Sequence, residues 1–168
     1  MLHFQGKQGK LALLGACLLT AGSARAGVTV NYVHPEEFSD LPRAPYQREI
    51  ALDDFVNHFK RLGEGLRADQ DLSIEVLDID LAGREEPNGI GNDELRIMNG
   101  GADWPRMRLH YALSEHGKVV ASGDAQLSDK GYANHINGYP NDARWPYEMQ
   151  MIDTWWRKTI APLASAAR

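Results

Sequence analysis

Residues 72–81 have the sequence LSIEVLDIDL. Apolar and polar residues alternate through its first half, which predicts a β-strand with one buried face. The apolar positions change phase between Val76 and Leu77, so that Ile79 and Leu81 continue the series from Leu77. Either a strand covered on both faces or a β-bulge produces such a change. This is the strongest strand signal in the chain.

The segments around it predict the rest of a sheet. Residues 28–33 alternate and are rich in β-branched side chains, which indicates a strand. Residues 107–114 and 118–128 predict two more strands, joined by three residues, a connection short enough for a hairpin. A long polar loop follows Gly83 up to about Asn92, and residues 94–98 predict a minor strand.

Two segments have helical periodicity. From about Tyr46 apolar residues recur at helical spacing until Gly63 and Gly65 stop the helix. A second helix is predicted over residues 147–161, after Pro146 and closed by Pro162. Its apolar residues occupy more than half of the circumference, which indicates deep packing or a face kept for a partner.

This order of elements predicts an α+β fold. We expect a single domain over residues 27–168, with an antiparallel-dominated sheet of about four strands and two helices packed on one face. Those 142 residues are enough for one domain to bury its own core.

Residues 1–26 have the pattern of a cleaved secretory signal peptide. Lys7 and Lys10 precede an apolar run over residues 11–22, and Ala24 and Ala26 form a small-x-small cleavage site. The run is too short for a permanent anchor across roughly 30 Å of hydrocarbon. We expect export to the periplasm rather than to the medium, with no transmembrane anchor in the mature chain. Lipidation at Cys17, which follows Leu14-Gly15-Ala16, is the alternative.

The composition of the mature region excludes several functions. Residues 27–168 carry 15 Lys and Arg against 23 Asp and Glu, a net charge of −8, so a basic face for nucleic acid is not expected. Cys17 is the only cysteine, so the mature domain has no thiol chemistry and no disulfide. The sequence lacks glycine-rich nucleotide motifs and metal-binding histidine spacing. We therefore predict no cofactor and no metal.

The first candidate block is formed by Asp78 and Asp80. Two residues apart on a strand, their carboxylates project from one face about 7 Å apart. Such a pair suits Ca²⁺ or Mg²⁺, or a division of acid and base roles. In the structural alternative, one of them pairs with Arg84, Arg106 or Arg108 and the other caps the following turn.

The second candidate block is Gly100-Gly101-Ala102-Asp103-Trp104-Pro105-Arg106. The glycine pair permits unusual backbone angles just before a strand. Trp104 would then be a stacking platform beside Asp103. Alternatively, Trp104 closes the end of the core and Asp103 binds local amides.

The third candidate block is the loop over residues 129–145, where aromatic residues alternate with Asn and Asp. Flat rings stack on sugars and amides bind hydroxyls, so the loop suits a glycan or peptide groove. Glu148 follows, inside the apolar arc of the second helix, where burial would raise its pKa. Alternatively, it favours the helix dipole in the first turn. The candidate binding residues are Trp104, Arg106, Asp129, Tyr132, Tyr139 and Trp145.

Several motifs together resemble a known family. They are IEVLDIDLAG at residues 74–83, GGADWPR at 100–106, LSD at 127–129 and YEM at 147–149, with Asp153 and Trp155. The chain resembles the exported bacterial family catalogued as domain of unknown function 3016. The resemblance covers essentially the whole mature region and implies small exported proteins, mostly of Gram-negative bacteria, with no assigned activity. It carries over no catalytic residue.

Three functions follow from these observations, and whether the protein is an enzyme stays open. The leading hypothesis is a periplasmic binding or interaction module for a cell-envelope glycan or protein. The alternative is a carboxylate- or divalent-metal-dependent hydrolase. A structural envelope protein without a ligand is the third. The hydrolase hypothesis uses Asp78, Asp80, Asp103 and Glu148 and requires them to lie close together.

Overall fold

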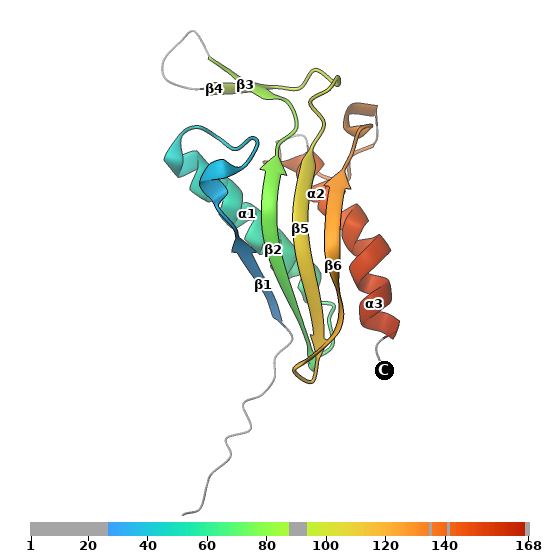
Figure 1. Ribbon diagram of the computed structural model, residues 1–168. Coiled ribbons are helices and arrows are strands. Elements are labelled where there is room, and N and C mark those ends of the chain that lie inside the picture. The colour runs from blue at the N-terminus through green and yellow to red at the C-terminus, as the bar shows by residue number, and fades with distance from the viewer. Residues whose placement is uncertain (1–26, 88–93, 135, 141, 167–168) are drawn as a thin grey trace, which may run out of the picture.

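Four strands form the main sheet in the order β1-β2-β5-β6 (Figure 1). They are β1 (Gly27–Tyr32), β2 (Gln70–Asp80), β5 (Arg106–Glu115) and β6 (Lys118–Ser128). β1 runs parallel to β2, and the β2–β5 and β5–β6 pairs are antiparallel. The predicted antiparallel-dominated sheet of four strands is confirmed.

The computed structural model describes residues 27–87, 94–134, 136–140 and 142–166. The predicted signal peptide and the lipidation alternative at Cys17 lie outside the described residues. None of the described helices has the length and the apolar character that crossing a membrane requires.

A β-bulge explains the phase change in the central strand. The register of β2 against β5 shifts between Val76 and Asp78. Val76, before the bulge, and Ile79, after it, are both fully buried, while Leu77 between them is 36% exposed. The extra residue moves the strand from one phase to the next, so burial on both faces is not its cause.

The predicted hairpin between β5 and β6 is confirmed. Its two turn residues, His116 and Gly117, both have positive φ, 51° and 74°. Such a turn matches the twist of the flanking strands, and glycine adopts it without strain.

The predicted polar loop after Gly83 was wrong for part of its length. β3 (Arg84–Pro87) pairs with β4 (Glu94–Ile97) in a separate two-stranded ribbon, which extends beyond the end of the main sheet (Figure 1). The sequence REEP shows no alternation of apolar residues, so only the pairing with β4 makes it a strand. The minor strand predicted near residues 94–98 is confirmed.

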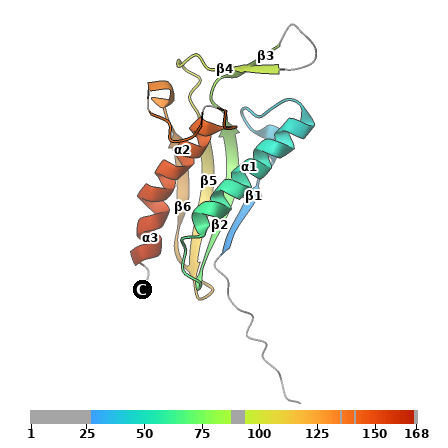
Figure 2. The same ribbon diagram turned by 180° about the vertical axis from the view of Figure 1, so that it is seen from behind.

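Helices cover one face of the main sheet, as predicted (Figure 2). They are α1 (Pro45–Gly63) and a second helix made of α2 (Pro146–Trp155), the π-helical turn η3 (Trp156–Ile160) and α3 (Ala161–Ala166). Two short 3-10 turns, η1 (Pro35–Glu37) and η2 (Tyr132–Asn134), lie in the connections.

The predicted closure of the second helix at Pro162 was wrong. Proline lacks an amide hydrogen, and its ring clashes with the carbonyl four residues back in a regular α-helix. Here the helix widens just before the proline, and Ala161 N donates to Trp156 O, five residues back. The wider turn accommodates the proline, and the helix continues to Ala166.

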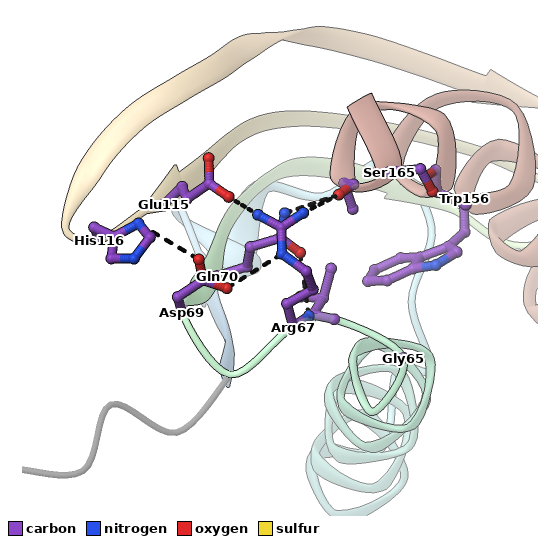
Figure 3. A pocket seen from close by; sticks show the side chains of 11 residues that line it. Gly65, Arg67, Asp69, Gln70, Glu115, His116, Trp156 and Ser165 are labelled. Carbon is purple, nitrogen blue, oxygen red and sulfur yellow. Dashed lines mark hydrogen bonds and ion pairs between the residues drawn. The ribbon is translucent and has the colours of Figure 1, made fainter. Parts of the chain in front are cut away.

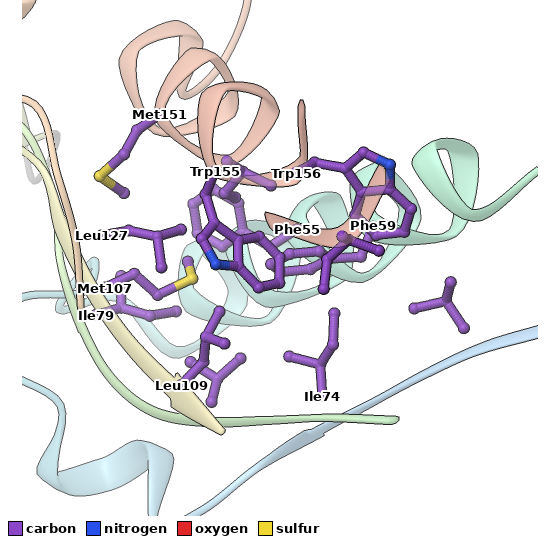
Figure 4. Packing of buried hydrophobic residues seen from close by; sticks show 14 of the residues in the cluster. Phe55, Phe59, Ile74, Ile79, Met107, Leu109, Leu127, Met151, Trp155 and Trp156 are labelled. Carbon is purple, nitrogen blue, oxygen red and sulfur yellow. The ribbon is translucent and has the colours of Figure 1, made fainter. Parts of the chain in front are cut away.

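The core lies between the helices and the covered face of the sheet (Figure 4). Phe55 and Phe59 of α1 are fully buried against strand residues such as Ile74 and Leu109, and Trp155 packs on Phe59 edge-to-face at 6.3 Å. Each fully buried side chain of this size contributes about 1.5–3 kcal/mol. The other face carries polar side chains, and no described element covers it (Figure 1).

Candidate functional site

A cavity of about 400 Å³ lies where the β3–β4 ribbon, the loop before α2 and the start of α2 meet. We call it the Trp145 cavity. Its lining includes Arg96, Asn137, Tyr139, Trp145, Tyr147 and Glu148. Three of these, Tyr139, Trp145 and Glu148, are candidates from the sequence.

The backbone at Trp145 sets the entry into α2. Trp145 has left-handed angles, φ 57° and ψ 41°, and Pro146 begins the helix directly after it. Its carbonyl oxygen accepts a hydrogen bond from Met149 N at 3.0 Å. The indole ring packs against Phe55 of α1, with ring centroids 6.2 Å apart. Trp145 is thereby held in place by both helices.

Among the described residues, three buried donors in the lining lack a hydrogen-bond partner. One is Arg96 Nη2, which has only an ion pair with Glu85 at 3.5 Å, and the other two are neutral. Trp145 Nε1 and Asn137 Nδ2 are both buried, and neither has a hydrogen-bond acceptor in the described part of the chain. Asn137 Oδ1 is occupied, because it accepts from Tyr139 N at 2.9 Å. A buried donor without an acceptor costs about 1–3 kcal/mol. The cavity thus presents two donors that a ligand oxygen would satisfy.

Glu148 is a buried acid in the same lining. Its side chain is 2% exposed, and Oε1 accepts a hydrogen bond from Ala82 N at 2.6 Å. Burial raises the pKa of Glu148 above its usual 4.5, although the Ala82 amide and the nearby Arg96 charge oppose the rise. The prediction that Glu148 lies in the buried arc of the second helix is confirmed.

Arg96 carries the positive charge next to Glu148, and carboxylates balance it. Its Nη1 donates to Asp40 Oδ2 at 2.7 Å and to Ala82 O at 3.2 Å. Its Nη2 lies 3.5 Å from Glu85 Oε1. Asp40 and Glu85 thus neutralise the guanidinium of Arg96. The other arginine of the lining, Arg144, has its Nη1 3.6 Å from Asp54 Oδ2.

Tyr139 contributes an aromatic ring to the lining of the cavity, and a hydrogen bond of its hydroxyl group holds the ring in position. Its hydroxyl donates to Asp153 Oδ2 at 2.7 Å, and His58 Nε2 lies 2.8 Å from Asp153 Oδ1. Burial, and then the hydrogen bond to Asp153, raise the pKa of the Tyr139 hydroxyl. Gly138 N donates to Gln150 Oε1 at 2.9 Å, so the loop is tied to α2 at two points. This wall is organised before any ligand arrives.

The first two candidate blocks meet in a different cavity, of about 540 Å³, on the uncovered side of the sheet. We call it the Trp104 cavity. Its lining includes Asp78, Asp80, Trp104 and Arg106, together with two residues that the sequence analysis did not propose as binding residues, Arg108 and Lys130.

Both aspartates of the first block are paired. Arg106 Nε donates to Asp80 Oδ2 at 2.8 Å, and Arg108 Nε lies 3.7 Å from Asp78 Oδ2. Asp78 also accepts hydrogen bonds from the Ser39 amide and hydroxyl, at 2.8 and 2.9 Å. The structural alternative expected one aspartate to pair with an arginine, and Asp80 does so. The cap expected of the other was wrong, because Asp78 bonds to Ser39 and lies near Arg108.

Asp103 organises the glycine loop that precedes β5. It accepts hydrogen bonds from Asn99 N at 3.0 Å and Gly101 N at 3.1 Å. The Asn99 amide is the main cause that lowers the pKa of Asp103 below 3.8. The Tyr132 hydroxyl also donates to Asp103, at 2.9 Å. The reading in which Asp103 binds local amides is therefore confirmed.

Two further candidate binding residues take part in the packing of the loop. Tyr132 is 1% exposed, and its ring packs on Tyr147 at 4.8 Å. Asp129 lines a third cavity, of about 380 Å³ beside α2, and its Oδ1 accepts from Gly131 N at 3.1 Å. Tyr132 is thus removed from direct contact with a ligand.

A fourth cavity, of about 820 Å³, lies between the β5–β6 hairpin and α3 (Figure 3). Asp69, Glu115 and His116 bring one ligand atom each to within 4.8 Å of one another there, a grouping that metal ions favour. However, Arg67 pairs with both carboxylates and donates to Ala164 O at 3.0 Å. The Arg67 guanidinium therefore occupies the place of a cation in this cluster, and its hydrogen bond to Ala164 O connects α3 to the hairpin.

Sequence reasoning missed Arg96, Asn137 and Lys130. Arg96 lies on a short strand without a motif, and it reaches its partners Asp40 and Ala82 only through the fold. Asn137 belongs to a loop with several asparagines, and the sequence does not show which of them is buried. Lys130 directly follows the candidate binding residue Asp129, and this neighbourhood in the sequence was the only indication that Lys130 could belong to a site.

The comparisons with known proteins agree with the resemblance noted in the motifs. The searches of curated proteins and of solved structures found no match. A family model described as "Protein of unknown function (DUF3016)" matches residues 26–158. This match covers the sheet, α1, α2 and both the Trp145 and Trp104 cavities, and the chain therefore belongs to the DUF3016 family.

Proposed function

We propose that the protein is exported and acts as a binding module of the cell envelope, with a sugar-like ligand in the Trp145 cavity. The observation that carries this proposal is that two buried neutral donors in the lining of one cavity, Trp145 Nε1 and Asn137 Nδ2, have no hydrogen-bond partner among the described residues. Such donors are retained at a cost to stability, and ligand binding is a reason to retain them.

The lining favours a neutral ligand with several hydroxyl or carbonyl oxygens. Tyr139, Trp145 and Tyr147 supply aromatic surface for the apolar faces of a sugar ring. The two donors match oxygen acceptors, and the charge of Arg96 is already balanced by Asp40 and Glu85. The volume of about 400 Å³ suits a ligand of one or two sugar rings.

Export supports an envelope glycan as the source of the ligand. The charge, apolar run and cleavage site within residues 1–26 have the order of a secretory signal peptide. A periplasmic protein meets the glycans of the envelope and does not meet cytoplasmic nucleotides.

The hydrolase hypothesis stays a prediction, and the arrangement of the four acids does not favour it. Asp78 and Asp80 line the Trp104 cavity, Glu148 lines the Trp145 cavity, and Asp103 binds the amides of its own loop. Shared acid–base chemistry requires two carboxyl groups on either side of one scissile bond. We therefore base the proposal on binding.

NMR titration of the ¹⁵N-labelled mature chain tests this proposal. The indole N–H signal of Trp145 reports on the cavity directly, and the probes are glucose, N-acetylglucosamine and their β-linked disaccharides. We expect a saturable shift of the Trp145 signal with at least one of them. Trp145→Phe keeps an aromatic ring but removes the donor, and its affinity is read from the backbone amide signals of the lining residues. Asn137→Asp keeps the acceptor for Tyr139 N but removes the other donor.

A matched control separates loss of a donor from general damage. Trp155 Nε1 is also buried without a hydrogen-bond partner among the described residues, but Trp155 packs in the core. We expect Trp155→Phe to leave the sugar affinity unchanged. Trp145→Phe and Asn137→Asp should each weaken it about fivefold or more, the worth of a hydrogen bond of about 1 kcal/mol. If no probe shifts the Trp145 signal, the reading as a structural envelope protein without a ligand gains support and the proposal fails.

A further inference from the structure

The Trp104 cavity collects positive charge on an otherwise acidic protein. Arg106, Arg108 and Lys130 line it together with two carboxylates, Asp78 and Asp80. Counted as formal charges, these five residues leave a surplus of one positive charge. Residues 27–168 as a whole have a net charge of −8, so this local balance is reversed.

The two carboxylates do not use up the donors of the three cations. Asp80 accepts from Arg106 with a single oxygen, Oδ2. Asp78 takes its close hydrogen bonds from Ser39, and Arg108 remains at 3.7 Å, outside hydrogen-bond distance. Within the described ranges, Lys130 has no carboxylate partner.

Trp104 holds two of the cations in place. The guanidinium carbon of Arg106 lies 5.0 Å from the centre of the Trp104 ring, and Lys130 Nζ lies 5.4 Å from it. A cation over an indole ring is oriented and partly shielded from water at a gain of about 0.5–1 kcal/mol at exposed sites. The ring therefore acts as a support for the cations, which present their remaining donors to the cavity.

We propose that the Trp104 cavity is a binding site for a singly charged oxyanion, the carboxylate of an acidic sugar or the phosphodiester of an envelope polymer. One negative charge balances the surplus of the lining, and the N–H groups of Arg106, Arg108 and Lys130 match its oxygens. The site is separate from the Trp145 cavity, and the proposal does not depend on the sugar proposed there. The half-exposed arginines make the binding weak and salt-dependent.

The test follows the indole N–H signals of Trp104 and Trp145 in one titration of the mature chain. Sodium glucuronate supplies the carboxylate, dimethyl phosphate supplies the phosphodiester, and glucose and sodium chloride are the neutral and ionic controls. We expect a saturable shift of the Trp104 signal with at least one oxyanion and none with glucose or with chloride at equal ionic strength. A response to only one oxyanion identifies the source.

Charge-matched variants decide whether the cavity is responsible. Arg108→Gln/Lys130→Gln removes two of its cations, and we expect the oxyanion affinity to fall about tenfold or more. The control Arg84→Gln/Lys118→Gln removes the same charge from the β3–β4 ribbon and the hairpin, outside this lining, and should keep the affinity within about twofold. Absence of any Trp104 shift, or an equal shift in both double variants, would overturn the proposal. The Trp145 signal reports separately on the sugar site.

Discussion

Replacing Glu148 by glutamine removes a buried ionisable group from the Trp145 cavity while keeping its shape. The amide oxygen of glutamine still accepts the hydrogen bond that Ala82 N donates to Glu148 Oε1. The substitution therefore changes how folding is coupled to protons, with little change in packing. Its effect on stability should depend on pH, and the direction follows from the burial of the carboxyl group.

The direction in which the free energy of unfolding changes with pH follows from the raised pKa of Glu148 in the folded protein. Well below pH 4.5 the carboxyl group is protonated in both folded and unfolded chains, so it adds no pH dependence. Above pH 4.5 the unfolded chain releases the proton while the folded protein retains it. The wild-type free energy of unfolding then falls with rising pH, by at most one proton's worth, about 1.4 kcal/mol per pH unit. The fall ends once Glu148 ionises in the folded state.

Urea unfolding of the wild type and of Glu148→Gln between about pH 4 and pH 8 measures this difference. We expect the variant to gain stability relative to the wild type as the pH rises from 4.5, and then to keep a constant advantage. Glu75→Gln, on the uncovered face of the sheet, is the control, because solvent screens an exposed carboxylate. A stability difference between Glu148→Gln and the wild type that stays constant over the whole pH range would show that Glu148 does not retain its proton on folding.

The other predictions concern the packing of the core and the hydrogen bond from Arg67 to Ala164 O of α3, which we call the latch. Phe59→Ala should lower the free energy of unfolding by about 3–5 kcal/mol in urea titrations, because the ring is fully buried; a loss below 1 kcal/mol would contradict the core described here. Gly63→Ala should destabilise by about 1–3 kcal/mol, because an added Cβ would lie 2.1 Å from Val28 Cγ2. Gly65→Ala should be nearly neutral, because its Cβ would meet only Leu62 O, at an ordinary contact distance of 3.8 Å. Arg67→Ala should cost about 1 kcal/mol and speed amide hydrogen exchange in α3, because Ala164 O loses a donor; unchanged exchange there would argue against the latch.

Local sequence patterns were sufficient for most of the fold. The phase change at Val76–Leu77 indicated either a bulge or a strand covered on both faces, and the structure shows the bulge. The periodicity before Gly63 indicated α1, because this signal arises from neighbouring residues. The pairing of β3 with β4 and the continuation of the helix through Pro162 were not predictable in this way. The first depends on a distant partner, and the second on a widened turn that overrides the usual effect of proline.

A residue of the candidate site was predictable only where its position within a single helix or strand determines its surroundings. Glu148 lies at a position that the helical period alone places in the buried arc. By contrast, Asn137 Nδ2 and Trp145 Nε1 lack a partner because no other described segment places a hydrogen-bond acceptor next to them, and the sequence does not show this. In the same way, the Trp104 cavity needs Lys130 to lie over a ring 26 positions earlier in the chain. Such contacts come from tertiary structure.

We propose that the Trp145 cavity binds a hydroxylated ligand through Trp145 Nε1 and Asn137 Nδ2, which have no hydrogen-bond partner among the described residues. A crystal structure of the mature chain with the sugar that binds best in the titrations tests it most directly. We predict sugar oxygens at about 2.7–3.2 Å from both Trp145 Nε1 and Asn137 Nδ2. A structure in which the sugar lies elsewhere, and ordered water alone meets these two donors, would contradict the claim.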